Sequence, residues 1–201
     1  MCWRLKREMD ILKSDRYYIN LILSGNREAF SAIIERYQDN VYNLALKICG
    51  NREDAEEIAQ DSFIKVFRSL RSFKGRSSFA TWLYRIVYNT SITFVRKNKL
   101  DILRLEDFPV DSVDFMRDSD TEEEAEIEYM KMLLSYALQK LEHEDRAIIT
   151  MHYYQDLNHT EICTITGLSR SNIKVRLFRA RRKIQQIIEK NIVKEPKYEK
   201  V

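Results

Sequence analysis

The sequence has little glycine and proline, few cysteines and no long apolar segment. Only 4 of its 201 residues are glycine and 2 are proline, which disfavours a collagen-like, low-complexity or turn-rich β protein. The three cysteines, Cys2, Cys49 and Cys163, are odd in number and widely spaced, so they predict reduced thiols rather than a disulfide framework. Short apolar runs exclude a transmembrane helix, and the charged N-terminus lacks a signal-peptide core. We therefore expect a cytoplasmic protein without membrane insertion.

The residues that are present predict an all-α fold. Hydrophobic residues make up 44% of the chain, enough for one or two packed domains. From residue 10 to residue 99 the apolar positions repeat at helical spacing, as in Phe30, Ile33, Ile34 and Tyr37. We expect this stretch to form one bundle of amphipathic helices.

Charge is distributed unevenly along the chain. Residues 101–128 contain 12 acidic residues against two arginines, a net charge of −10, whereas the whole chain carries +3. A stretch of such composition repels itself and stays extended, so we predict an acidic flexible linker at 100–128. The linker separates a domain at 10–99 from one at 129–190, and 191–201 is a charged tail. Whether the linker is a solvated spacer or has a role of its own stays open.

A helix-turn-helix is predicted within residues 129–190. Asn158, followed three residues later by Glu161, resembles a capping box that starts one helix. Gly167 provides the permissive backbone of a tight turn, and Ser169 is a favourable N-cap for the next helix. The unit therefore has start signals for both helices and a short turn between them.

The second helix of this unit is basic. Ile173, Leu177, Ala180 and Ile184 repeat at spacings of three and four, which predicts an apolar stripe that packs on the domain. The cations expected to point away from this stripe are Arg170, Lys174, Arg176 and Arg179. A helix of this kind fits the major groove of double-stranded DNA, its N-terminal residues reaching base edges.

A polar patch is predicted on the helix that begins near Asn51. Its first turns are acidic, which the helix dipole alone can explain. Four of its polar residues nevertheless fall along one side, namely Asp54, Glu57, Gln60 and Asp61. Phe63 is expected to continue that side, while Ile58, Ile64 and Phe67 point inward. Such a patch suits a protein partner.

Residues 72–79 form a loop with two cations and two aromatic residues between helices. These residue types can hold single-stranded nucleic acid, because bases stack on aromatic rings and cations track the backbone. Trp82 follows on the next helix, where tryptophan is more often a core residue than a stacking one. Arg85, Asn89 and Arg96 are expected to lie on one exposed surface of that helix.

The order of these motifs resembles the extracytoplasmic-function sigma factors, small two-domain members of the sigma-70 family of bacterial RNA polymerase initiation factors. The resemblance rests on residues 50–63, the loop at 73–79, the helix at 81–86 and residues 175–181. It implies a sigma region 2-like helical bundle and a sigma region 4-like helix-turn-helix, with bacterial RNA polymerase core and promoter DNA as partners. Family members are commonly held inactive by an anti-sigma factor, which nothing in the sequence identifies.

Site residues follow from the resemblance, position by position. Core polymerase binding is implied for Asp54, Glu57, Gln60, Asp61 and Phe63. Recognition of the minus-10 element is implied for Lys74, Arg76, Ser77, Ser78, Phe79, Trp82, Arg85, Asn89 and Arg96. Recognition of the minus-35 element is implied for Arg170, Ser171, Asn172, Lys174, Arg176 and Arg179. Of these, Arg170 or Arg176 is expected to reach a base and Lys174 a phosphate.

Two other classes of protein are alternatives for this sequence. A stand-alone helix-turn-helix transcriptional regulator explains the C-terminal motif equally well, but leaves the polar patch and the loop unexplained. An enzyme is disfavoured because no nucleophile or phosphate-binding glycine loop accompanies His143, His152 and His159. His159 and Cys163 have the i, i+4 spacing of metal ligands but lack further ligands. We expect no cofactor, no metal and no catalytic residues.

Overall fold

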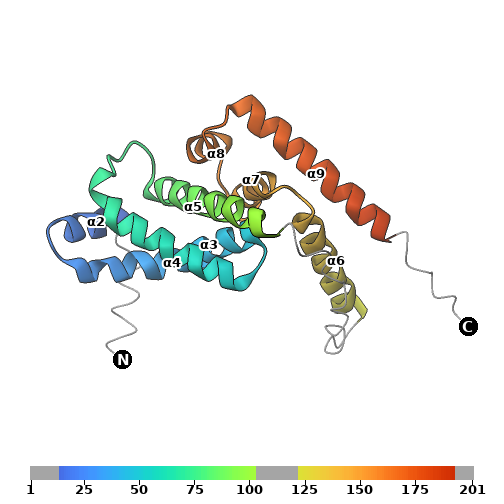
Figure 1. Ribbon diagram of the computed structural model, residues 1–201, viewed down its shortest axis with the longest axis horizontal. Helices are drawn as coiled ribbons and strands as arrows, with labels where there is room; N and C mark the ends of the chain where they lie inside the picture. Colours follow the sequence, from blue (N-terminus) through green and yellow to red (C-terminus); the bar gives the residue numbers. More distant parts are fainter. Residues whose placement is uncertain (1–13, 103–121, 193–201) are drawn as a thin grey trace, which may run out of the picture.

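The computed structural model describes residues 14–102 and 122–192, and within these ranges the chain forms α-helices and short 3-10 helices without a strand (Figure 1). The predicted all-α fold is confirmed. The first group of elements is α2 (Asp15–Leu23), η1 (Arg27–Ala29), α3 (Phe30–Cys49), α4 (Arg52–Ser69), η2 (Leu70–Ser72) and α5 (Phe79–Ile102). The second group is α6 (Glu122–Gln139), α7 (His143–Tyr153), α8 (His159–Thr166) and α9 (Arg170–Ile192).

The N-terminal group is a bundle built around α3. Ile33, Val41, Leu44 and Ile48 of this helix are fully buried, because their spacing places them on one face. That face packs on α4 and α5. The helix ends at Gly50, whose φ of 95° is a left-handed conformation that glycine adopts without strain. The chain can therefore turn sharply into α4.

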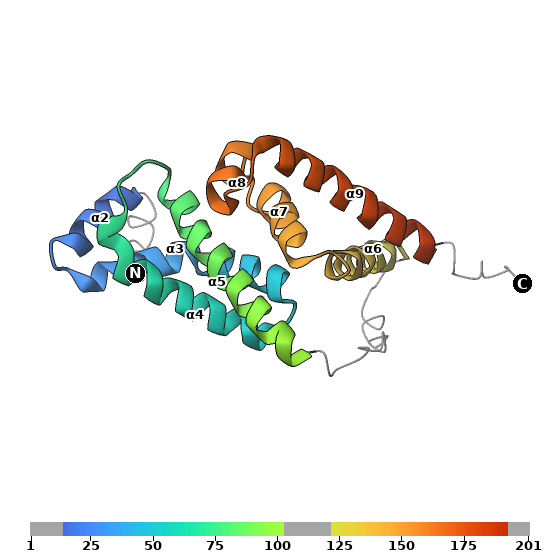
Figure 2. The same ribbon diagram turned by 45° about the horizontal axis from the view of Figure 1, so that its top comes forward.

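The C-terminal group packs around α7, which contacts both α8 and α9. Ala147, Ile148 and Met151 of α7 are fully buried. Helix α6 packs against α9 (Figure 2) and begins at Glu122, inside the stretch 100–128 assigned to the linker. Residues 103–121 of that stretch, and 193–201 of the tail, lie outside the described residues. The domain boundaries themselves stay predictions.

The two groups are packed against each other. Helix α3 contacts α7, and α5 contacts α8, so that α7 and α8 lie beside the N-terminal bundle in both ribbon views (Figures 1 and 2). One cluster of buried apolar residues runs through both groups. Sequence periodicity predicted each group but not this closed arrangement. In the described ranges no helix is both long and apolar enough to cross a membrane.

Candidate nucleic-acid interface

The helix-turn-helix has the predicted caps. The side chain of Asn158 accepts hydrogen bonds from the backbone N–H groups of Thr160 and Glu161 at 2.9 and 3.1 Å. In return, the N–H of Asn158 donates to the Glu161 carboxylate at 3.0 Å, which completes the capping box. Gly167 has a φ of 77° in the turn, and Ser169 Oγ accepts from the N–H of Asn172 at 3.3 Å. These contacts fix where α8 and α9 begin.

Most of the predicted minus-35 residues are exposed on α9. Of its predicted apolar stripe, Ile173, Leu177 and Ala180 are buried against the domain and Ile184 is half-buried. The exposed members of the predicted set are Arg170, Ser171, Asn172, Lys174 and Arg179. The sequence did not single out Val175 and Phe178, which are 45% and 60% exposed beside them. Phe178 lies one position after Leu177, and Val175 lies two positions from both Ile173 and Leu177, so helical spacing places both off the apolar stripe.

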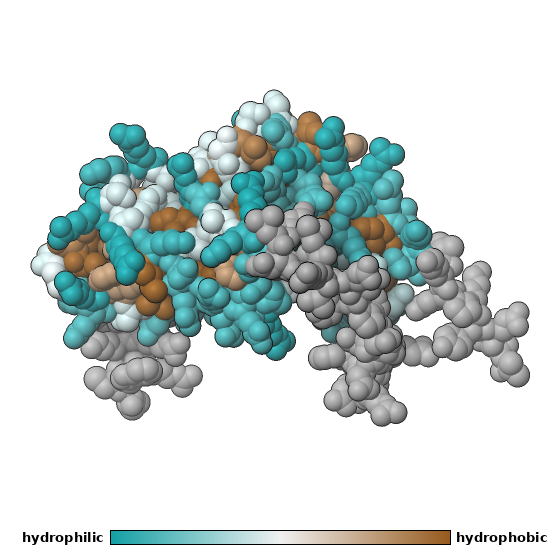
Figure 3. All heavy atoms as spheres, viewed as in Figure 1, coloured by the Kyte–Doolittle hydropathy of each residue, from teal (hydrophilic) through white to brown (hydrophobic). Residues whose placement is uncertain are grey.

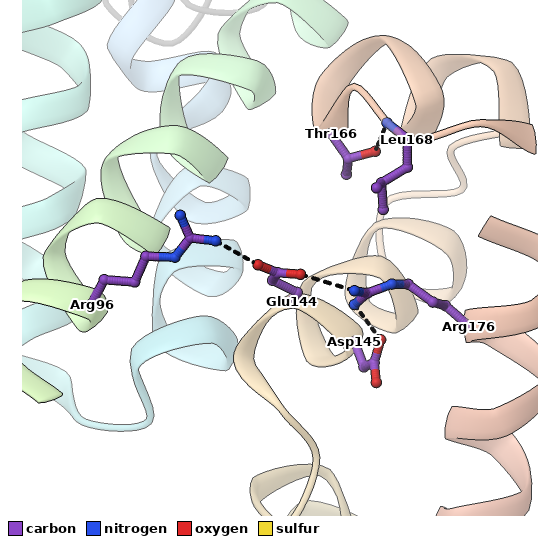
Figure 4. Close-up of polar contacts among 6 residues, drawn as sticks. All are labelled: Arg96, Glu144, Asp145, Thr166, Leu168 and Arg176. Carbon is purple, nitrogen blue, oxygen red and sulfur yellow. Dashed lines mark hydrogen bonds and ion pairs between the residues drawn. The ribbon is translucent and has the colours of Figure 1, made fainter. Parts of the chain in front are cut away.

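Arg176 departs from the prediction. Its side chain is 29% exposed and pairs with two carboxylates of α7, Glu144 at 3.0 Å and Asp145 at 2.7 Å (Figure 4). The expectation that it points freely away from the packed side is therefore wrong. Arg176 lies on the flank of the apolar stripe, close enough to α7 for its guanidinium to reach the acidic first turn of that helix.

The loop before α5 holds its cations outward. Lys74, Arg76 and Ser78 are exposed and Ser77 is half-buried. Ser78 also caps α5, because its Oγ accepts from the N–H of Thr81 at 3.1 Å. In the described residues of α5, Arg85, Asn89 and Arg96 are exposed and recur at spacings that place them on one face, as predicted.

The aromatic residues of this region are buried in the core or pack against it. Phe79 is only 4% exposed, and its ring lies 5.6 Å from Phe73, 5.7 Å from Tyr37 and 5.8 Å from Trp82. Phe79 is thus a core residue in this arrangement, and its implied part in minus-10 recognition stays a prediction. Trp82 is half-buried at the edge of the same cluster, so its ring remains the available stacking surface.

The polar patch on α4 is present but its aromatic edge is different. Glu57, Gln60 and Asp61 are exposed. Asp54 is half-buried and takes part in the helix start, where its N–H donates to Asn51 Oδ1 at 2.8 Å. Phe63 is 9% exposed and packs edge-on against Phe30. Its predicted exposure is wrong.

Of the three apolar residues of α4 that were expected to point inward, Ile58 is fully buried and the other two are exposed. Ile64 is 48% exposed and Phe67 is 37% exposed. Apolar side chains also gather at the α2 end of the molecule (Figure 3). Because apolar residues occur on several sides of α4, spacing alone did not fix which of them face the core. The patch is therefore acidic with an aliphatic and aromatic border.

The histidines have structural contacts. His143 Nδ1 donates to the carbonyl oxygen of Ile48 at 2.7 Å, and His152 Nδ1 lies 3.2 Å from the carbonyl oxygen of Leu157. His159 lies beside His152 with ring centroids 5.3 Å apart; desolvation and the neighbouring His152 and α9 cations lower its pKa. Within residues 14–102 and 122–192, no three His, Cys, Asp or Glu residues gather as metal ligands do, and Cys49 and Cys163 are free thiols.

Both helical groups match models of known protein families. Residues 33–100 match the family model "Sigma-70 region 2", and residues 131–184 match "Sigma-70, region 4". The ECF RNA polymerase sigma-E factor of Haemophilus influenzae is 30% identical over 182 residues, covering 88% of this chain and 96% of the relative. The ECF RNA polymerase sigma factor SigW of Bacillus subtilis is 29% identical, covering 84% of this chain and 93% of the relative.

Solved structures share the fold. The sigma factor RpoE of Bartonella quintana, solved with the anti-sigma factor NepR, superposes with a TM-score of 0.63 at 19% identity, covering 80% of this chain and 96% of that chain. CnrH, solved with the cytosolic domain of CnrY, gives a TM-score of 0.62 at 22% identity, covering 88% and 98%. Both of the helical groups described above thus have counterparts in solved structures.

Proposed function

Because the chain belongs to the extracytoplasmic-function RNA polymerase sigma factors of the sigma-70 family, we propose that it binds core polymerase through α4 and recognises promoter DNA through α5 and α9. The single observation that supports this division is that the three surfaces lie on three different helices, each of which begins at its own side-chain cap: Asn51 for α4, Ser78 for α5 and Ser169 for α9. Such a protein acts in the cytoplasm, where the polymerase is. It contributes binding rather than catalysis.

The minus-35 element is proposed to bind α9 as duplex. Arg170 is the first residue of the helix and is exposed, and N-terminal residues of a recognition helix reach base edges in the major groove. Lys174 is exposed one turn later, where its ammonium suits a phosphate. Arg179 adds a further exposed cation. Arg176 contributes only when it leaves its two carboxylate partners.

The minus-10 element is proposed to bind as an unpaired strand at the loop before α5. Lys74 and Arg76 are exposed and can pair with phosphates. A base taken out of its stack costs a few kcal/mol, so the loop and Trp82 stabilise an open state that duplex DNA visits rarely. Arg85, Asn89 and Arg96 continue the exposed surface along α5 towards the adjoining duplex. In this proposal the protein opens DNA by binding the unpaired strand, which shifts the equilibrium between duplex and open DNA towards the open state.

The α4 patch is proposed to dock on core polymerase. Exposed acidic and amide groups at Glu57, Gln60 and Asp61 lie on the same helix as exposed Ile64 and Phe67, and an apolar area with a polar border is typical of protein interfaces. We also propose an anti-sigma protein as an alternative partner, since the Bartonella relative was solved with one.

Charge reversal in this patch tests the docking surface. Replacing Asp61 with lysine is expected to weaken binding to bacterial core polymerase about tenfold, because a misplaced charge at an interface opposes association. Fluorescence anisotropy of the labelled full chain, titrated with core enzyme, measures the change. Glu35→Lys is the matched control, since Glu35 is an exposed acid on α3. Equal weakening by both variants contradicts the assignment.

A stand-alone regulator is not favoured. It accounts for region 4 alone, whereas the family match also covers residues 33–100. A regulator binds its duplex without polymerase. Nuclease protection of promoter DNA by the free protein is therefore the observation that favours it.

A further inference from the structure

A pair of imidazole rings lies beside the cations of the proposed minus-35 surface. His159 is the first residue of α8 and is half-buried. Its ring lies beside that of His152 of α7, with centroids 5.3 Å apart and planes inclined by 32°. Three cations of α9, Arg170, Lys174 and Arg181, act electrostatically on the same imidazole. The helix-turn-helix and α7 thus bring two titratable rings and a group of permanent charges together.

The two rings differ in their contacts. His152 Nδ1 lies 3.2 Å from the carbonyl oxygen of Leu157, and its ring packs edge-on against that of Tyr153 with centroids 4.8 Å apart. His152 is therefore held by neighbours within the domain. The ring of His159, by contrast, makes no hydrogen bond within residues 14–102 and 122–192. Both of its nitrogens are available to a ligand.

The surroundings of this ring are electropositive. Arg170 and Lys174 are exposed, and in the described part of the chain neither forms an ion pair with a carboxylate. Glu161, the one acid of α8, is occupied, because it accepts from the N–H of Asn158 at 3.0 Å and from Thr81 Oγ1 of α5 at 3.4 Å. No free carboxylate of α8 therefore offsets the α9 cations.

These neighbours keep the imidazole of His159 neutral in the free protein. Desolvation lowers its pKa, and so do the adjacent His152 and the cations of α9, because each of them disfavours a further positive charge. The ring is therefore predominantly uncharged at neutral pH. An anion placed beside it would have the opposite effect and would favour the imidazolium.

DNA on α9 would supply such an anion. In a helix-turn-helix the second helix lies in the major groove while the first helix crosses the backbone. Helix α8 is this first helix and packs against α9, and its first residue, His159, lies within electrostatic range of Arg170, the first residue of α9. A duplex seated on α9 therefore brings phosphates past the start of α8.

We propose that His159 is a phosphate-binding residue of the minus-35 surface and that it makes this contact as the imidazolium. Its ring N–H then donates a charge-assisted hydrogen bond to a phosphate oxygen. The proton comes from solvent, and by linkage it raises the affinity for DNA by the same factor by which DNA raises the affinity for the proton. Promoter binding therefore strengthens as the pH falls through the range in which His159 titrates. The inference rests on the proposed function, since it requires a duplex on α9.

Promoter binding by the polymerase complex at several pH values tests this contact. A labelled duplex with the minus-35 element of a promoter found by run-off transcription is titrated with core enzyme that carries the full chain. Between about pH 8 and about pH 6, the starting chain should gain about three- to tenfold more affinity than His159→Gln, which stays neutral. His159→Lys, which stays charged, should show the weaker pH dependence of His159→Gln and bind more tightly than the starting chain at the higher pH.

The salt dependence separates a phosphate contact from a structural role. For the starting chain, the slope of log affinity against log salt should be steeper by about 0.9 at the lower pH, because one more phosphate is neutralised there. For His159→Gln and His159→Lys the slope should be the same at both pH values. A purely structural residue would alter affinity without this change of slope, and circular dichroism checks that the helices remain folded.

The other two histidines provide the controls. His143 lies in the first turn of α7, where its Nδ1 is 2.7 Å from the carbonyl oxygen of Ile48, so His143→Gln should keep the full pH dependence. His152→Gln removes a ring that lowers the pKa of His159, so the gain in affinity should persist with its midpoint at a higher pH. Loss of the gain in His152→Gln but not in His159→Gln contradicts the assignment.

The same titrations distinguish this contact from the proposed function. If the complex binds the promoter but His159→Gln keeps the pH dependence and the salt slopes of the starting chain, the contact is overturned and the proposed function stands. If the complex binds no promoter at any pH, the proposed function is overturned, and the contact with it.

Discussion

Replacing Leu177 with alanine is expected to lower the free energy of unfolding by about 2–5 kcal/mol, the range for removing a large buried aliphatic side chain. Leu177 is 2% exposed and belongs to the buried cluster that runs through both helical groups. Removing it leaves a cavity under α9, at the point where that helix packs on the domain. Urea denaturation of the full chain, followed by circular dichroism, measures the change.

Val175 provides the matched control for this prediction. It lies two residues away on the same helix and is 45% exposed, so Val175→Ala should change stability by no more than about 0.5 kcal/mol. Comparable losses in the two variants contradict the packing of α9 described above. A loss confined to Leu177→Ala supports the assignment of the apolar stripe.

Arg170 and Lys174 are expected to differ in what their loss does to promoter binding. Arg170→Ala should weaken binding of the polymerase complex by about 1–3 kcal/mol, or about 5- to 150-fold, and relax preference at one base pair, because a bidentate arginine contact reads a base. Lys174→Ala should weaken all promoter variants alike and lower the slope of log affinity against log salt by about 0.9.

Competition among minus-35 variants at several salt concentrations separates these outcomes. Each variant serves as the control for the other, since both residues are exposed cations of α9. A uniform loss for Arg170→Ala identifies a phosphate contact in place of base reading. A position-specific loss for Lys174→Ala contradicts its assignment to a phosphate.

Local chemistry made the C-terminal motif predictable. The capping box of Asn158 and Glu161, the left-handed Gly167 and the N-cap Ser169 each depend on residues within a few positions of one another. The buried stripe of α9 depends only on helical spacing. Such features are encoded in short stretches, so a single sequence is enough to find them.

Long-range contacts were not predictable in the same way. Arg176 pairs with carboxylates of α7 about thirty positions away, and no local pattern indicates that distance in space. Phe63 and Ile64 both lie on α4, and the buried one, Phe63, packs against Phe30 of another helix. The closed packing of α3 on α7 likewise joins residues that are far apart in the sequence. Family resemblance supplied roles for these residues but not their partners.

This chain directs bacterial core polymerase to promoters, and run-off transcription on fragments of the genome that encodes it, with and without the protein, measures that activity. Transcripts with defined start sites should appear only when the protein is added. If no such transcripts appear, while the protein alone protects a duplex from nuclease, the claim is contradicted and the chain is a stand-alone DNA-binding regulator.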